Sequence, residues 1–405
     1  MRFVISTCER ARNLLGVGVF LLSGGVGTAY AVEEGPFSVL TAVGYSYDSN
    51  VLRVSDDVSG VPLLGVVSRS DKIAHYNLNL GLDTHYSLQK FSANASWSRQ
   101  EYQRFTYLDH TNRKVSGDWL WQLGSRFDGE VGLRYQKELT SLADLVVPVA
   151  EMRTEKAVNL KANYSIHPDW KLTMGFDDVR VQRGLTNLQK YNHDDSRASL
   201  GLRYFGSQGN SIGLKAIYGS VDYPNQTGGA PGNSDNSYQY HSLRATVVWV
   251  PSGATSLRGS VGFERVRHRQ LSGQDYDGLV GRLTHAWRAG KIEVTTNIWQ
   301  EVSPDSSISD YVLSRGASVA PSWMFSPKFS ASVKFLQEFK DYRGGTNVLL
   351  SNPEDTNQTM HVGASYGVSE NLVITTGYDV GLRDSNRPGR GYSYHVWAID
   401  LQLSF

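Results

Sequence analysis

The sequence predicts an all-β fold, a transmembrane antiparallel up-and-down β-barrel of about 18 strands of the Gram-negative outer-membrane type. Two observations predict it. Segment after segment alternates apolar and polar side chains with a period of two, as a strand with one apolar and one wet face does. The connections between these segments are alternately short and long, which is the arrangement of periplasmic turns and outer loops. A soluble sandwich has no reason to sort its loops by length.

The start of the chain resembles a secretory signal peptide. A basic region from Arg2 to Arg12 precedes an apolar run over 14–22 and an A-x-A cleavage site at 29–31. The apolar run is too short to span a bilayer. We therefore expect residues 1–31 to be removed and residues 32–405 to form a single barrel domain in the outer membrane.

Composition agrees with this class and excludes others. The only cysteine, Cys8, leaves with the signal peptide, so the mature chain has no disulfide and no cysteine metal site. The chain has 40 Lys and Arg against 39 Asp and Glu, a balance that gives no bulk attraction to nucleic acid. No later apolar stretch is long enough for a transmembrane helix. The 22 tyrosines, 14 phenylalanines, 9 tryptophans and 40 glycines favour a β membrane protein.

The strands follow one another along the whole mature chain. In the first, Val43 and Tyr45 face one way, and Gly44 and Ser46 face the other. The predicted strands are 37–47, 72–88, 91–101, 112–124, 129–139, 152–166, 170–182, 195–205, 210–222, 237–250, 255–267, 276–287, 291–301, 310–325, 329–340, 355–368, 372–382 and 392–405.

The last strand is the usual closing strand of such a barrel. Ile399, Leu401, Leu403 and Phe405 lie on its apolar face, and Asp400 lies on its polar face. We expect this strand to pair with the first strand, with the apolar face toward lipid. Phe405 is interpreted as an assembly signal for the barrel assembly machinery and as a residue of the aromatic girdle.

Two kinds of connection alternate between the strands. The short ones are 89–90, 125–128, 167–169, 206–209, 251–254, 289–290, 326–328 and 369–371. The longer, polar ones include 48–71, 102–111, 140–151, 183–194, 223–236 and 341–354. The long loops can narrow the mouth, but no long inward-folded constriction loop is apparent.

Outward aromatic side chains gather near the strand ends, where their amphipathic rings suit the headgroup level of a membrane. They are Tyr45, Tyr47, Trp97, Trp119, Trp121, Tyr135, Tyr164, Trp170, Trp249, Trp287, Trp323, Phe325 and Phe405. A platform for stacking carbohydrate is the alternative interpretation, but for outward residues an aromatic girdle explains the pattern better.

Inward positions carry charges of both signs, unevenly placed. A predicted basic wall on neighbouring strands consists of Arg197, Arg203, Lys215, Arg244, Arg258 and Arg282. A predicted acidic wall near the closure consists of Asp83, Asp379 and Asp400. Arginine forks suit carboxylate or sulfate groups on a passing polymer. Paired wall charges that keep the lumen wet are the other interpretation, and the sequence leaves both open.

The sequence gives little support to an enzyme. Asp177-Asp178 and His193-Asp194-Asp195 lie near the outer rim, where an Asp and His pair could activate water. A solvated rim or loosely bound Ca²⁺ explains these residues more simply. The chain contains no G-x-S-x-G, no H-E-x-x-H and no phosphate loop. We therefore predict no catalytic residues, no metal site and no cofactor.

An ordered set of motifs resembles the EpsL-type barrels of exopolysaccharide gene clusters that accompany an exosortase. These motifs are Gly44–Arg53, Tyr102–Asp109, Trp119–Gly124, Leu139–Asp144, Arg153–Glu155 and Tyr164–Trp170. The resemblance implies an outer-membrane component for export of an extracellular polysaccharide in a Gram-negative bacterium. It also implies a periplasmic polysaccharide-export protein as partner. It carries no established site residues.

The sequence therefore predicts an outer-membrane pore that takes part in exporting a polysaccharide, with lipid and lipopolysaccharide around it. The predicted basic wall would suit an anionic polysaccharide. Two other classes of function are left open. One is a general or substrate-selective diffusion porin. The other is a purely structural or adhesive barrel, or a rim-located hydrolase.

Overall fold

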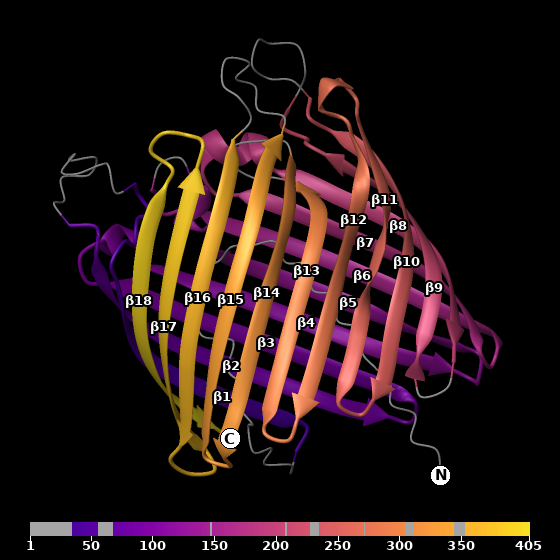
Figure 1. Ribbon diagram of the computed structural model, residues 1–405, viewed down its shortest axis with the longest axis horizontal. Coiled ribbons are helices and arrows are strands. Elements are labelled where there is room, and N and C mark those ends of the chain that lie inside the picture. The colour runs from indigo at the N-terminus through magenta and orange to yellow at the C-terminus, as the bar shows by residue number, and fades with distance from the viewer. Residues whose placement is uncertain are drawn as a thin grey trace.

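A closed β-barrel accounts for almost all of the chain (Figure 1). The computed structural model describes residues 35–55, 68–145, 148–206, 209–226, 235–270, 272–304, 311–343 and 353–405. These residues form one antiparallel sheet of 18 strands. The sheet closes because β1 (Phe37–Asp48) pairs with both β2 (Asp71–Tyr86) and β18 (Tyr392–Ser404). The predicted fold class is confirmed, while the predicted signal peptide lies outside the described residues.

Each predicted strand is present, and its ends differ from the prediction by a few residues at most. The other strands are β3 (Gln89–Tyr102), β4 (His110–Leu123), β5 (Phe127–Leu139), β6 (Met152–His167), β7 (Trp170–Arg183), β8 (His193–Phe205), β9 (Ser211–Asp222), β10 (Tyr238–Ser252), β11 (Thr255–His268), β12 (Tyr276–Ala289), β13 (Ile292–Pro304), β14 (Tyr311–Ser326), β15 (Phe329–Arg343), β16 (Glu354–Gly367) and β17 (Leu372–Ser385). The turn expected at Gln89-Lys90 lies instead at Ser87-Leu88, where Ser87 has a φ of 55°.

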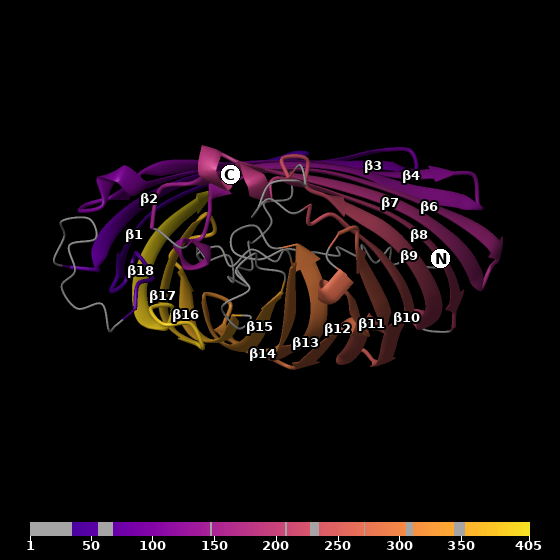
Figure 2. The same cartoon turned by 90° about the horizontal axis from the view of Figure 1, so that it is seen from above.

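The barrel is oval in cross-section (Figure 2). Strands β8 to β11 lie toward one end of the oval, and β16 to β18 lie with β1 at the other end. Short turns join the strands at one end of the barrel, where the C-terminus also lies (Figure 1), and longer connections join them at the other. This sorting of the connections places the long loops outside the cell.

The outer surface carries an apolar belt. Outward side chains such as Phe263, Leu133 and Ile298 are 67%, 57% and 57% exposed. Aromatic pairs gather at the short-turn end, including Trp323–Phe325 with ring centroids 4.3 Å apart and Trp170–Tyr204 at 5.2 Å. In water such a surface would aggregate, whereas in a bilayer it needs no partner besides lipid.

Short 3-10 helices occur in the long connections, namely η1 (Thr106–Leu108), η2 (Leu142–Asp144), η3 (Thr186–Tyr191) and η5 (Ser272–Gln274). Across the described ranges, no helix is both long and apolar enough to cross a membrane.

Candidate pore lumen and outer mouth

The residues of the predicted basic wall lie on adjacent strands. Arg197 and Arg203 are on β8, Lys215 is on β9, Arg244 is on β10, Arg258 is on β11 and Arg282 is on β12. Their positions alternate with the exposed apolar residues of the outer belt, so their side chains belong to the inner face. The sheet order therefore brings all of them to one side of the oval.

Carboxylates from neighbouring strands accompany several of these arginines. The ion pairs are Arg197–Asp177 at 2.9 Å, Arg244–Glu264 at 2.6 Å and Arg282–Glu301 at 2.7 Å. This side of the lumen is therefore mixed in charge, as the interpretation of paired wall charges expects. Contact between these arginines and a polymer stays a prediction.

Lys215 lies among several other cations of this side. Its cross-strand neighbour on β10 is Arg244. Lys161, Arg197 and Arg244 repel it electrostatically, and the carboxylate of Asp177 attracts it. Within the part of the chain that the structure describes, Lys215 has no ion pair. This position is therefore available to an anion in the channel.

The residues of the predicted acidic wall also have partners. Asp83 lies near the short-turn end, with Lys90 at 3.3 Å, and both side chains are exposed. On β17, Asp379 contacts Nδ1 of His361 at 2.8 Å. This part of the wall is also mixed in charge.

Asp400 forms a bridge across the barrel seam. Its Oδ1 lies 2.7 Å from Nε2 of His75, and both side chains are buried. His75 is on β2 and Asp400 is on β18, so the contact passes over β1 at Gly44. A Cβ at Gly44 would collide with both side chains. Glycine is therefore required at position 44 for His75 of β2 to reach Asp400 of β18.

The connection between β5 and β6 folds into the barrel mouth. Its η2 residue Leu142 is buried among loop residues and inward side chains of the first strands, namely Val51, Ile73, Tyr102, Phe105 and Leu108. Arg383 on β17 donates a hydrogen bond of 2.5 Å to the carbonyl of Ala143 and lies 3.8 Å from Asp144. In the sheet, β18 and β1 to β4 separate β17 from β5. The prediction of no long inward-folded loop stays a prediction, whereas tertiary packing brings this shorter segment into the mouth.

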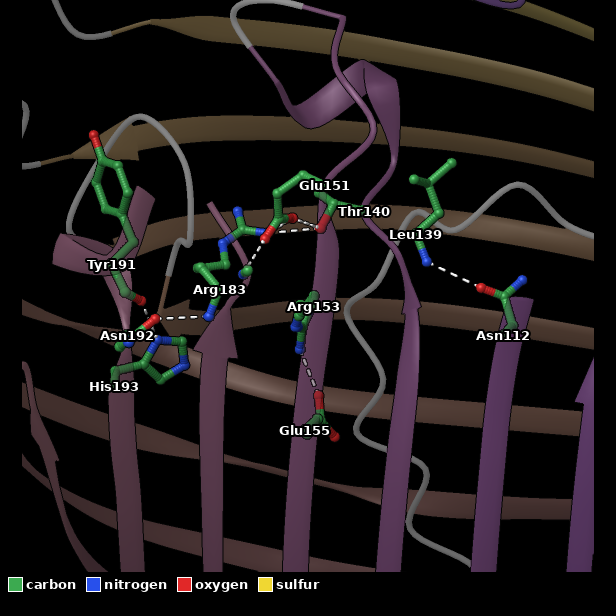
Figure 3. A network of polar contacts seen from close by, with 11 residues as sticks. Asn112, Leu139, Thr140, Glu151, Arg153, Glu155, Arg183, Tyr191, Asn192 and His193 are labelled. Atoms are coloured by element: carbon green, nitrogen blue, oxygen red, sulfur yellow. Dashed lines mark hydrogen bonds and ion pairs between the residues drawn. The ribbon is translucent and has the colours of Figure 1, made fainter. Parts of the chain in front are cut away.

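A buried ion pair holds the base of this inward segment, which is described over residues 140–145 and 148–151 and is called segment 140–151 below (Figure 3). Arg183 at the end of β7 donates to Oε2 of Glu151 at 2.8 Å, and neither side chain is exposed. Arg183 also donates to Oγ1 of Thr140 at 2.7 Å, and the Thr140 hydroxyl donates to Glu151. The backbone N–H of Gly184 donates to Oε1 of Glu151 at 3.0 Å. The two ends of the segment are thereby fixed to each other and to β7.

Arginines stacked on tyrosines surround the tip of the segment. The guanidinium of Arg53 lies 3.8 Å from the ring centroid of Tyr394 and forms a 2.9 Å ion pair with Asp48. The guanidinium of Arg383 lies 5.2 Å from the ring centroid of Tyr392. Close by, Arg390 forms a 3.0 Å ion pair with Asp355 and lies 5.5 Å from the ring centroid of Tyr342. Cation–π contacts and ion pairs together give this part of the mouth a fixed shape.

A cluster rich in aromatic residues packs together near the outer ends of β9 to β14. Its buried members are Val221, Tyr223, Tyr238, Val266, Tyr276, Val280, Tyr311 and Leu313. The hydroxyl of Tyr311 donates to the carbonyl of Gln274 at 2.7 Å. The cluster therefore links the outer ends of these strands to η5.

The predicted rim pair of Asp and His residues is not assembled into a site. His193 is buried, and its Nδ1 lies 3.1 Å from the carbonyl of Tyr191. Asp177 is paired with Arg197 in the lumen, whereas Asp178 accepts a hydrogen bond from Ser196 on the opposite face of the sheet. In the described ranges, no group of three His, Cys, Asp or Glu residues could hold a metal ion.

Comparison with known proteins gives no family. No protein-family model matches the chain, and no curated protein matches its sequence. Among solved structures, it is similar to OccK2 (OpdF) of Pseudomonas aeruginosa at 13% identity and a TM-score of 0.48, over 92% of this chain and 100% of that one. OccK9 (OpdG) of the same organism has 11% identity and a TM-score of 0.47, with 92% and 100% covered. The outer membrane protein OprD has 9% identity and a TM-score of 0.44, with 91% and 94% covered.

The closed sheet, the apolar belt with its aromatic pairs and the charged, hydrogen-bonded interior are the defining features of one class. The chain is a β-barrel of the outer membrane.

Proposed function

We propose that this protein is a water-filled channel for small hydrophilic solutes, narrowed near its outer mouth by the inward segment 140–151. The observation that carries the proposal is the attachment of this segment on two sides. Arg183 fixes its base through Glu151, and Arg383 on the far strand β17 contacts its tip at Ala143. A segment held in this way narrows the opening without depending on a bound partner.

The lining of the channel supports passage of polar solutes. Paired charges such as Arg244 and Glu264 keep an inner surface hydrated, and they leave little net charge to trap a permeant ion. Lys215, with cations on either side of it, adds a preference for solutes that carry a carboxylate or sulfate group. The proposed substrates are therefore small anionic or neutral hydrophilic molecules.

Single-channel conductance and liposome swelling test the proposal. The purified barrel is expected to give a small conductance and to admit small sugars while excluding oligosaccharides. Arg383→Ala removes the contact at the tip of the segment, so we expect a larger conductance and a higher size limit.

The matched control is Arg265→Ala. Arg265 lies near the same end of the barrel on β11 and forms its ion pair on the outer face, with Asp277 at 2.9 Å. An equal rise in conductance in both variants would contradict a specific role for the inward segment. A wild-type barrel that passes neither ions nor small sugars would overturn the channel proposal.

Polysaccharide export is a second candidate, because the motifs that resemble EpsL-type barrels meet at the outer mouth. The motif Tyr102–Asp109 contributes Phe105 and Leu108 to the cluster around Leu142, and Leu139–Asp144 contributes Leu142 itself. Export would require a periplasmic polysaccharide-export protein as partner and an energy source outside this chain. Its support is the sequence resemblance together with this convergence.

Blockade by polymer separates the two candidates. If the channel exports an anionic polysaccharide, acidic polysaccharides added on the periplasmic side should block its conductance at concentrations where neutral dextrans do not. Ordinary small-solute conductance with no blockade by any acidic polymer would favour the diffusion channel alone.

A further inference from the structure

Four cations gather on the membrane-facing side of the barrel, at its long-loop end. Arg113 on β4, Lys137 on β5, Lys156 on β6 and Arg180 on β7 are all exposed and point outward. We call them the outer basic patch. The strand register places Arg113 directly opposite Lys137, and Lys156 directly opposite Arg180. Two like-charge cross-strand pairs therefore lie side by side.

This arrangement is unfavourable for the barrel by itself. Side chains directly opposite each other on antiparallel strands have Cβ atoms roughly 5 Å apart, and like charges at that separation destabilise the sheet. Among the patch residues, Arg180 has a carboxylate partner, Asp178 at 3.3 Å. Within the described part of the chain, Arg113, Lys137 and Lys156 form no ion pair.

The other side of the barrel shows how the same surface is arranged when charges are balanced. On β11, Arg265 and Arg267 also point outward at the long-loop end. Both contact Asp277 of the neighbouring strand, at 2.9 Å and 2.5 Å. In the part of the chain that the structure describes, Arg113, Lys137 and Lys156 of the outer basic patch lack such partners, so a counter-charge for these three side chains has to come from outside the chain.

The position of the patch along the barrel axis indicates which part of the membrane supplies the counter-charge. Val115 and Tyr135, which are cross-strand partners, are the next outward residues below Arg113 and Lys137, and Val115 is 51% exposed. Below Tyr135 on the same strand, the apolar belt continues with Leu133, which is 57% exposed. The patch therefore begins where the apolar belt ends, on the side of the long outer loops. That level contains the headgroups of the outer leaflet.

We propose that the outer basic patch binds the phosphate groups of a lipopolysaccharide molecule in the outer leaflet. Phosphate oxygens accept charge-assisted hydrogen bonds from guanidinium and ammonium groups, and the negative charge removes the repulsion within each cross-strand pair. The site is independent of what passes through the channel.

Thermal unfolding of the purified barrel tests the proposal. The barrel is prepared in lipopolysaccharide-free detergent and measured alone, with purified lipopolysaccharide, and with the same lipopolysaccharide after chemical dephosphorylation. The patch variant is Arg113→Gln/Lys137→Gln, and the matched control is Arg265→Gln/Arg267→Gln. We expect lipopolysaccharide to raise the unfolding temperature of the wild type and the control, and to bind the patch variant about tenfold more weakly.

Three results would overturn the proposal. The first is an unchanged lipopolysaccharide effect in the patch variant. The second is an equal effect from dephosphorylated lipopolysaccharide, which would assign the binding to acyl chains. The third is a lower unfolding temperature of the patch variant without any lipid, since removing an unrelieved like-charge pair should leave the lipid-free barrel equally stable or more stable.

Discussion

At the scale of single residues, Gly44 shows how one missing side chain permits a long-range contact. His75 and Asp400 belong to strands on either side of β1 and meet above Gly44 at 2.7 Å. Tyr240 passes over Gly219 in the same way to donate a 3.0 Å hydrogen bond to Asp195, two strands away. These glycines provide space on the inner wall, and the polar side chains that cross them link strands that are not neighbours.

Gly44→Ala should weaken the seam. The added Cβ would collide with Asp400, His75 and the backbone carbonyl of Ile399, so the buried bridge would have to separate. Two buried polar groups would then lose their partner, at a cost of about 2 kcal/mol. Urea unfolding in detergent should therefore show a lower midpoint. Gly117→Ala is the control, because its nearest new contact is an ordinary 3.9 Å to the carbonyl of Ser92. A midpoint equal to that of the control would contradict the role of the bridge.

The basic wall makes a prediction about ion selectivity. Replacing Arg203, Arg244 and Arg258 together by Ser should lower the ratio of anion to cation permeability several-fold, because inward positive charge is lost while Glu264 stays. Reversal potentials under a salt gradient measure this ratio. Unchanged selectivity would show that these side chains serve only to hydrate the wall.

At the scale of elements, the segment 140–151 gains its position from both of its neighbours. The buried pair of Arg183 and Glu151 closes its base, and the cluster around Leu142 holds η2 against the inner faces of β2 and β3. The contact of Arg383 with Ala143 holds η2 from the side of β17. Contacts with the barrel wall therefore stabilise the segment in its position inside the opening.

Glu151→Ala should loosen the segment. Arg183 is fully buried and would lose the carboxylate of Glu151, and removing one partner of a buried ion pair costs about 3–5 kcal/mol. We expect a lower unfolding temperature and larger current fluctuations in the open channel. The matched control is Arg153→Ala. Arg153 lies outside the segment and forms its ion pair with Glu155 of its own strand, at 2.5 Å. Equal current noise in both variants would contradict the assignment.

At the scale of the whole molecule, the barrel was predictable because strand periodicity and loop lengths depend on local sequence. The inward position of Asp400 and Lys215 follows from a period of two, without knowledge of the fold. Their partners do not follow, because His75 lies two strands away through the closure and the register of each pair is set by packing and turns. Arg183, Glu151 and Arg383 were missed for the same reason, and the motif Leu139–Asp144 was the one local indication of the inward segment.

The seam between β1 and β18 is an ordinary ladder, with two hydrogen bonds joining the backbones of Val39 and Phe405 at 3.0 Å and 2.8 Å. β1 and β18 are thus paired like two strands that a hairpin joins. The closed ring therefore has no beginning or end in its hydrogen bonding. We therefore expect a circular permutant of the barrel to fold. In this permutant a short linker joins Phe405 to Phe37, and the new ends lie at Gly290. Gly290 is in a tight turn, and no atom lies within 4 Å of the position of an added Cβ. Heat-modifiable gel mobility and conductance should match those of the original chain. Failure to fold would show that assembly depends on the order in which the strands are presented.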